Sequence, residues 1–266
     1  MRAKVGHLGT LDPFATGVLP LCVGEGTKIA QFLNAADKTY AGVMQLGAET
    51  DTGDKTGRVT RRAPVPTLGA ETLHAVAQRF VGEQLQTPPM FSAIKQEGVP
   101  LYKLARRGEE VAREPRRVVM HRLVLRASGD DTIAFDVHCS KGTYVRVLAQ
   151  DIGAALGSAA HLSALRRTRF GRFTLDGAIG IDDLRGGRIA SVIGLREALS
   201  DLPEIEVDRD FALRARRGQQ WALEALAQPA EDSAKLVGPD GELVAVISST
   251  ADRRWQFARV FGAGSR

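Results

Sequence analysis

The amino-acid sequence predicts an α+β protein with a mixed, largely antiparallel sheet, helices packed about a cleft, and a small β domain at the C-terminal end. Two strands are expected over 118–126 and 132–140, and the second alternates apolar and polar side chains. Apolar residues at helical spacing predict one helix after Thr67 and another after Arg146. The fold prediction is based on these elements and on a change to shorter expected elements near residue 202.

Further elements are expected around this framework. A helix is predicted over 26–33 with Thr27 as its N-cap, and a strand over 39–47. Two prolines exclude regular structure from 86–95, which should be a rigid loop or edge. The helix after Arg146 should end at Gly157, a typical C-terminal stop.

The C-terminal part of the chain has shorter elements. Residues 238–241 read Gly-Pro-Asp-Gly and predict a hairpin turn between strands over 235–237 and 243–246. We therefore expect two domains, 1–202 and 203–266.

The composition is that of an ordinary globular protein, with 44% hydrophobic and 25% charged residues in 266. No apolar run approaches the roughly 20 residues that span a bilayer. Cys22 and Cys139 lack the spacing of metal ligands, so we expect buried thiols in a reducing compartment. The expectation is a cytoplasmic protein without a metal site.

The chain is basic, with a formal net charge of +5. Such a balance suits a polyanionic partner, although a solvated basic face is equally common. The charges gather in two groups, which favours nucleic acid. The groups comprise Lys103, Arg106, Arg107, Arg113, Arg116, Arg117, Arg122 and Arg126, then Arg166, Arg167, Arg169 and Arg172.

One stretch near the start, Gly6–Gly17, holds a single carboxylate among glycines and apolar residues. Pro13 fixes its own φ and disfavours helical geometry at Asp12. A carboxylate in partly apolar surroundings is costly unless positive charge pairs with it. An isolated Asp-Pro is more often a simple turn, but the whole string is much rarer than Asp-Pro.

Several segments resemble the motifs of the bacterial TruB-type tRNA pseudouridine synthases, in the same order along the chain. These segments are GHLGTLDPFATG at 6–17, DKTY at 37–40, TDTGD at 50–54, QTPPMFSAIK at 86–95, LYKLAR at 101–106, SKGTYVR at 140–146 and AHLSALRR at 160–167. Leu8 stands where that family commonly has threonine. The strand and helix that usually precede the first motif are expected to be missing.

The resemblance implies a pseudouridine synthase fold and an isomerase that converts uridine to pseudouridine at position 55, in the T-loop of tRNA. Asp12 would be the catalytic carboxylate, acting on the sugar, the base or a ribose proton. Arg146 would pair with Asp12, and Tyr40 would contact the target base. A tyrosine in a strand is otherwise most often packed core, and an arginine in a first helical turn is most often solvated.

The resemblance also implies a set of substrate-binding residues. His7 would fill the place of the flipped uridine, and Leu165 would lie near the base, unless it is plain core. Asp54 would help hold the arginine. Lys95 belongs to a segment lining the cleft, and Tyr102 to a basic helix facing RNA. No cofactor is expected, the C-terminal domain should be PUA-like, and the chain should act on the tRNA T-arm as a monomer.

Two other classes of function remain open on the sequence. One is an RNA-binding protein without essential catalysis. The other is a carboxylate-dependent glycoside hydrolase, which would need a second acid, and Asp54 is the nearest candidate. An aspartic protease and a calcium loop are rejected for 50–57, because neither the flanking strand nor the ligand spacing fits.

Overall fold

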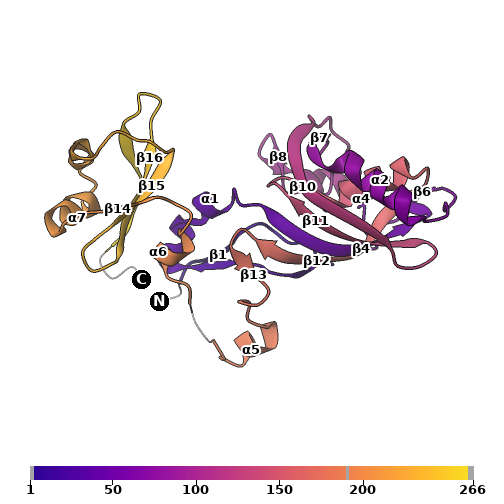
Figure 1. The fold of residues 1–266 in the computed structure, drawn as a ribbon, viewed down its shortest axis with the longest axis horizontal. Helices are drawn as coiled ribbons and strands as arrows, with labels where there is room; N and C mark the ends of the chain where they lie inside the picture. Colours follow the sequence, from indigo (N-terminus) through magenta and orange to yellow (C-terminus); the bar gives the residue numbers. More distant parts are fainter. Residues whose placement is uncertain (1–2, 190–191, 263–266) are drawn as a thin grey trace. The chain divides into compact units, whose positions relative to one another are not determined.

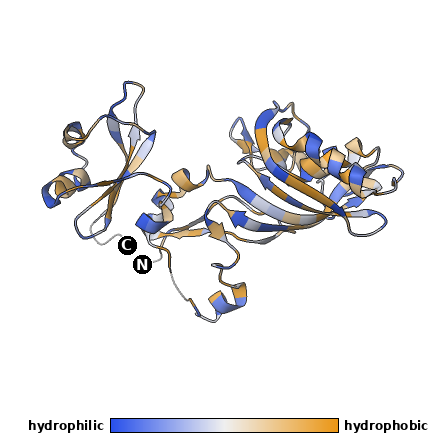
Figure 2. Ribbon diagram, viewed as in Figure 1, coloured by the Kyte–Doolittle hydropathy of each residue, from blue (hydrophilic) through white to orange (hydrophobic). Residues whose placement is uncertain are grey.

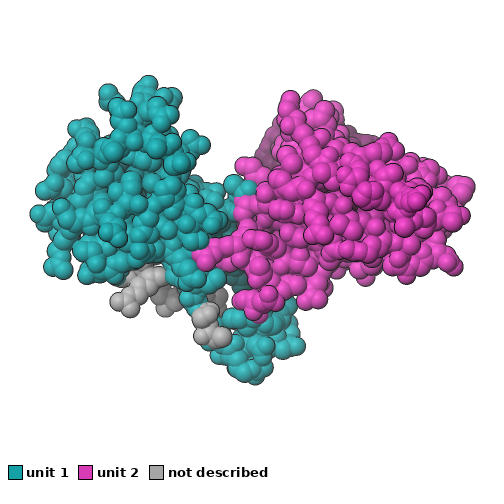
Figure 3. Space-filling view, viewed as in Figure 1, with its two compact units in different colours: residues 1–9, 20–35, 179–266 teal, residues 10–19, 36–178 magenta. Residues whose placement is uncertain are grey.

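The structure is a computed structural model that describes residues 3–189 and 192–262. The chain divides into two compact units, coloured separately in Figure 3. Residues 10–19 and 36–178 form the large unit, and residues 1–9, 20–35 and 179–266 form the small unit. The expected division into two consecutive domains, 1–202 and 203–266, stays a prediction.

A seven-stranded sheet is the framework of the large unit (Figure 1). Every neighbouring pair is antiparallel except β2 with β12, so the predicted mixed, largely antiparallel sheet is confirmed. The strand order is β13 (Phe173–Thr174), β12 (Ala160–Phe170), β4 (Lys38–Leu46), β11 (Thr132–Cys139), β10 (Arg116–Ala127) and β7 (Gly82–Gln86), with β2 (Thr16–Gly17) beside β12.

Two helices, α2 (Ala70–Phe80) and α4 (Val145–Ala155), pack on this sheet. In Figure 2 α2 carries both hydrophobic and hydrophilic residues, and its buried side chains are Leu73, Val76 and Ala77. They meet the inward residues of β11, such as Ile133 and Phe135, in one apolar cluster. Burial of each large apolar side chain contributes about 1.5–3 kcal/mol, so this cluster holds the helices to the sheet.

The predicted hairpin and later helix are both confirmed. β10 and β11 pair antiparallel, and the Ser128 amide donates to the Thr132 carbonyl across their turn. Helix α4 ends two residues before Gly157, which has φ +72°. Smaller elements complete the unit: β5 (Ala48–Thr50) with β6 (Val59–Arg62), β8 (Lys95–Gln96) with β9 (Val99–Pro100), and α3 (Leu101–Ala105).

The helix predicted over 26–33 is wrong as one element. The chain instead forms a 3₁₀ turn, η1 (Gly24–Lys28), and a single α-helical turn, α1 (Ala30–Leu33). The Thr27 hydroxyl donates to the Gly24 carbonyl and does not cap a helix. Gly24 and Gly26 lower the helix propensity of this stretch, which explains the interruption.

The small unit contains a separate four-stranded sheet in the C-terminal region. Its order is β14 (Glu204–Glu206), β15 (Ser233–Val237), β16 (Leu243–Ser249) and β17 (Trp255–Val260). The predicted hairpin turn joins β15 to β16, where the Gly238 amide donates to the Glu242 carbonyl. The unit also holds β1 (Val5–His7) paired with β3 (Leu21–Val23), and α5 (Ile181–Arg185), α6 (Leu195–Ala198), α7 (Arg209–Arg216) and η2 (Gln220–Ala225).

This C-terminal sheet has its own apolar core, in which Leu236, Val244 and Ile247 are fully buried. Asp208 caps α7 by accepting a hydrogen bond from the Phe211 amide at 2.7 Å.

None of the helices within the described ranges has the length and apolar character required to cross a bilayer.

Candidate active site

Asp12 lies at the start of a tight turn in the large unit. The Ala15 amide donates to the Asp12 carbonyl at 2.9 Å, and Pro13 occupies the second position of the turn, where its fixed φ is favourable. The Asp12 side chain is 31% exposed. The loop therefore presents one carboxylate that is partly buried and still open on one side.

Arg146 holds this carboxylate with two parallel hydrogen bonds. Its Nε donates to Asp12 Oδ2 and its Nη2 to Asp12 Oδ1, each at 3.0 Å. The Arg146 side chain is only 6% exposed, in the first turn of α4. The predicted ion pair is confirmed, and its fork geometry fixes the orientation of both carboxylate oxygens.

The remaining donors of the guanidinium bind two other segments. Nη1 donates to the Thr52 carbonyl at 2.7 Å, and Nη2 also donates to the Phe91 carbonyl at 2.8 Å. Arg146 thus connects its helix to three loops that lie far apart in the sequence. Since a guanidinium has five donors in a rigid plane, four such bonds leave it little freedom to move.

Asp54 organises the loop that supplies the Thr52 carbonyl. Its buried carboxylate accepts from the Thr52 hydroxyl at 2.9 Å and from the amide and hydroxyl of Thr56 at 2.9 and 2.5 Å. The described hydrogen bonds link Asp54 to Arg146 through Thr52 and include no direct contact between the two side chains. Gly53 has φ +74°, and a Cβ there would lie 3.1 Å from the Arg146 Cβ.

Tyr40 lies in β4 opposite Arg167 of β12, in direct cross-strand register. Burial raises the pKa of the Tyr40 phenol, while the charge of Arg167 and the hydrogen bond that Arg167 donates lower it. The charge of Asp12 raises this pKa further. Burial is the largest of these causes, so Tyr40 is a neutral phenol near neutral pH.

Arg167 is the residue that sequence reasoning placed wrongly. It was expected in an exposed basic group, yet only 1% of its surface is accessible. Its Nε donates to the Val18 carbonyl at 2.8 Å, and its Nη2 is buried without a hydrogen-bond partner among the described groups. In the folded strand β12, Arg167 shares a buried face with Leu165.

The structure gathers most of the other predicted residues in the large unit. Leu165 is buried in the main apolar cluster, against which Tyr40 and Phe14 also pack, so it is part of the core. Tyr102 is half-buried on α3, and its amide donates to the Ser92 carbonyl next to the residue that binds Arg146. Lys95 is exposed on β8.

His7 is exposed on β1 and belongs to the small unit. Its expected role in filling the place of a flipped base therefore stays a prediction.

Comparison with known proteins identifies the family. A model of the TruB family pseudouridylate synthase N-terminal domain matches residues 1–145, and a model of the tRNA pseudouridylate synthase B C-terminal domain matches residues 146–201. The chain belongs to the TruB family of pseudouridylate synthases.

Curated relatives of this TruB-family chain are named tRNA pseudouridine synthase B. The protein from Ralstonia pickettii is 46% identical over 246 residues, covering 88% of this chain and 76% of the relative. The protein from Geotalea uraniireducens is 46% identical over 228 residues, covering 84% and 74%. The resemblance found in the sequence is confirmed.

Solved structures support the TruB fold independently of close sequence similarity. A Cbf5-Nop10-Gar1 complex contains a chain that matches with a TM-score of 0.72 at 24% identity, covering 98% of this chain and 77% of that one. An H/ACA RNP bound to a substrate RNA contains another, with a TM-score of 0.70 at 22% identity. At such identities the likeness shows the fold alone.

Proposed function

We propose that this TruB-family chain converts uridine to pseudouridine at position 55, in the T-loop of tRNA, with Asp12 as the catalytic carboxylate. The bidentate pair of Asp12 and Arg146 carries this proposal. This ion pair fixes the orientation of a carboxylate that is still partly exposed. A group that acts on a bound substrate needs such a fixed orientation. The relatives' name, tRNA pseudouridine synthase B, supplies the reaction and the substrate class.

The proposed reaction is an isomerisation and requires no co-reactant. The N1–C1′ bond of uridine breaks, the uracil turns, and a C5–C1′ bond forms. The hydrogen on C5 leaves as a proton, and N1 gains one, so all atoms and electrons balance. Asp12 would act on the sugar, on the base or on a ribose proton.

Tyr40 would contact the target base and assist proton transfer as a neutral phenol. Its raised pKa argues against a tyrosinate base near neutral pH. Arg146 would position Asp12 and balance its charge, and Asp54 would support Arg146 through the Thr52 carbonyl.

The substrate must leave its stack before it can react, at a cost of a few kcal/mol. We assign to His7 the role of stacking in the vacated place, and to Lys95 and Tyr102 contacts with the T-arm. Exposed basic residues on and near α3 would contact phosphates. In this proposal the enzyme acts as a monomer in the cytoplasm, and its C-terminal sheet is a PUA-like RNA-binding domain.

The test uses a T-loop stem-loop RNA, with a matched RNA that carries cytidine at the target position. After incubation with the purified chain, pseudouridine is measured by chemical labelling and the resulting mass shift. We expect one labelled position in the first RNA and none in the second. Release of free uracil would instead indicate the hydrolase, and binding without any product would indicate an RNA-binding protein.

A further inference from the structure

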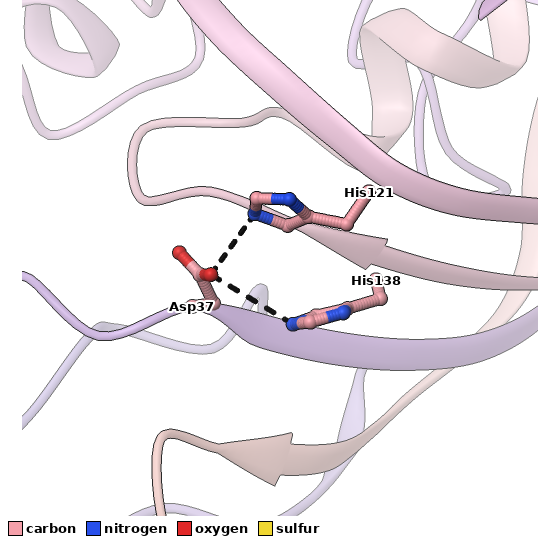
Figure 4. A group of neighbouring side chains, drawn as sticks. All are labelled: Asp37, His121 and His138. Atoms are coloured by element: carbon pink, nitrogen blue, oxygen red, sulfur yellow. Dashed lines mark ion pairs between the residues drawn. The ribbon is translucent and has the colours of Figure 1, made fainter. Parts of the chain in front are cut away.

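Three side chains that the proposed reaction does not use converge beside β4, β10 and β11. Asp37 directly precedes β4, His121 lies in β10 and His138 in β11, and Figure 4 shows all three pointing toward one another. One donor atom from each lies within 4.8 Å of the others. In the part of the chain that the structure describes, no other group of three or more His, Cys, Asp or Glu side chains meets this criterion.

An irregularity in β10 brings His121 into this group. Met120 pairs with Cys139 and Arg122 pairs with His138, so His121 is an extra residue in a β-bulge. The bulge leaves two consecutive residues, His121 and Arg122, exposed between the buried Met120 and Leu123. Bulges commonly re-aim a side chain, and this one turns His121 toward Asp37.

The distances suit a small metal ion. Asp37 Oδ2 lies 2.9 Å from His121 Nε2 and 3.8 Å from His138 Nε2. With metal–ligand bonds of about 2.0–2.2 Å, two ligand atoms of a tetrahedral site are about 3.4 Å apart. The Asp37–His121 separation is an ion-pair contact shorter than this value and the Asp37–His138 separation is longer, so side-chain rotations would complete the site.

We propose that Asp37, His121 and His138 bind a divalent transition-metal ion of the Zn²⁺ type. Two imidazoles and one carboxylate are donors that zinc, cobalt and nickel accept, whereas magnesium and calcium prefer oxygen ligands. All three side chains are about 40% exposed, which leaves the remaining coordination positions to water.

Positive charge near the group should limit its affinity. The charge of Arg169 acts on His138, and the Arg169 Nε donates to the Gly171 carbonyl at 2.6 Å. Lys38 follows Asp37 directly, and its Nζ donates to the Ala36 carbonyl and lies over the Phe170 ring. We therefore expect one ion per chain, bound more weakly than in closed four-ligand zinc sites.

The experiment uses Co²⁺ as the probe on the full chain without a histidine tag. Co²⁺ bound by imidazole and carboxylate absorbs visible light, so a titration gives stoichiometry and affinity, and Zn²⁺ should displace it. We expect one site, and a loss of affinity of at least about tenfold in His121→Gln, His138→Gln and Asp37→Asn. His74→Gln is the matched control, because His74 is an exposed histidine outside the group, and it should leave the affinity unchanged.

A second measurement needs no variant and so does not depend on folding of a mutant. Adding Zn²⁺ to the native chain should shift the imidazole nitrogen NMR signals of His121 and His138 and leave those of the other three histidines in place. Unchanged Co²⁺ affinity in the His121 and His138 variants would overturn the proposal. So would an equal loss in His74→Gln, or Zn²⁺ shifts that fall on other histidines.

Discussion

At the scale of single residues, the orientation of Asp12 depends on the two parallel hydrogen bonds from Arg146. Lysine keeps the charge but offers no planar fork, so Arg146→Lys should lose at least one charge-assisted bond. Such a bond is worth about 1.5–3 kcal/mol, which converts to a fall in kcat of about 10- to 150-fold. Pseudouridine formation under single-turnover conditions measures this change.

Arg126→Lys is the matched control for that substitution. Arg126 binds Asp136 through one hydrogen bond at an exposed position, and its replacement should leave kcat unchanged. Equal rates for Arg146→Lys and the unsubstituted chain would show that the fork does not matter to the reaction.

Tyr40 provides a second test at this scale, through pH. Burial raises its folded-state pKa above the unfolded value of about 10, so ionisation costs more in the folded chain. The stabilisation by the neutral phenol is present below about pH 10 and is lost as the pH rises through the folded pKa. Tyr40→Phe should therefore lose less stability than the native chain between about pH 9 and 11.

Urea unfolding at several alkaline pH values measures this difference. Parallel pH dependences for Tyr40→Phe and the native chain would contradict the buried, neutral state assigned to Tyr40.

At the scale of elements, Gly53 controls how closely the 50–57 loop approaches helix α4. Alanine at φ +74° costs about 1–2 kcal/mol, and its Cβ would also press on Arg146. We expect Gly53→Ala to lower both stability and kcat. Gly157→Ala is the control, because Gly157 has a similar φ of +72° with open space around it, and it should lower stability alone.

Thermal unfolding and single-turnover rates separate the two effects. Full activity in Gly53→Ala would mean that the position of this loop does not influence Arg146.

Sequence patterns predicted the elements whose formation depends on residues within one segment. The alternation of 132–140 gave β11, and apolar spacing with a terminal glycine gave α4. The strand β12, in contrast, was not predicted, because charged residues interrupt its pattern and its partner β4 is distant in the sequence. The group of Asp37, His121 and His138 could not be predicted either, because it depends on a bulge in a paired strand.

The candidate site was predictable only in part. No periodicity joins Asp12 to Arg146, and their pairing was expected solely from the family resemblance, before the geometry confirmed it. The burial of Arg167 was missed because a run of arginines normally indicates a solvated face.

At the scale of the whole molecule, the net charge of +5 should make RNA binding strongly dependent on salt. Lys103 is exposed on α3. If it contacts one phosphate, Lys103→Gln should reduce the magnitude of the slope of log K against log[salt] by about one. Arg126→Gln, which removes a charge already paired with Asp136, should change the slope less. Filter binding of the T-loop RNA at several salt concentrations gives these slopes. Equal slopes for the native chain, Lys103→Gln and Arg126→Gln would show that Lys103 does not contact the RNA.

The proposed role of Asp12 as the catalytic carboxylate is tested by single-turnover conversion of the T-loop RNA by Asp12→Asn, which keeps the size of the side chain and removes its charge. Asp130→Asn, at an exposed turn, is the control. We predict no detectable pseudouridine from Asp12→Asn at RNA concentrations where it binds as the native chain does, and full conversion by Asp130→Asn. Pseudouridine formation by Asp12→Asn at the native rate would contradict the claim.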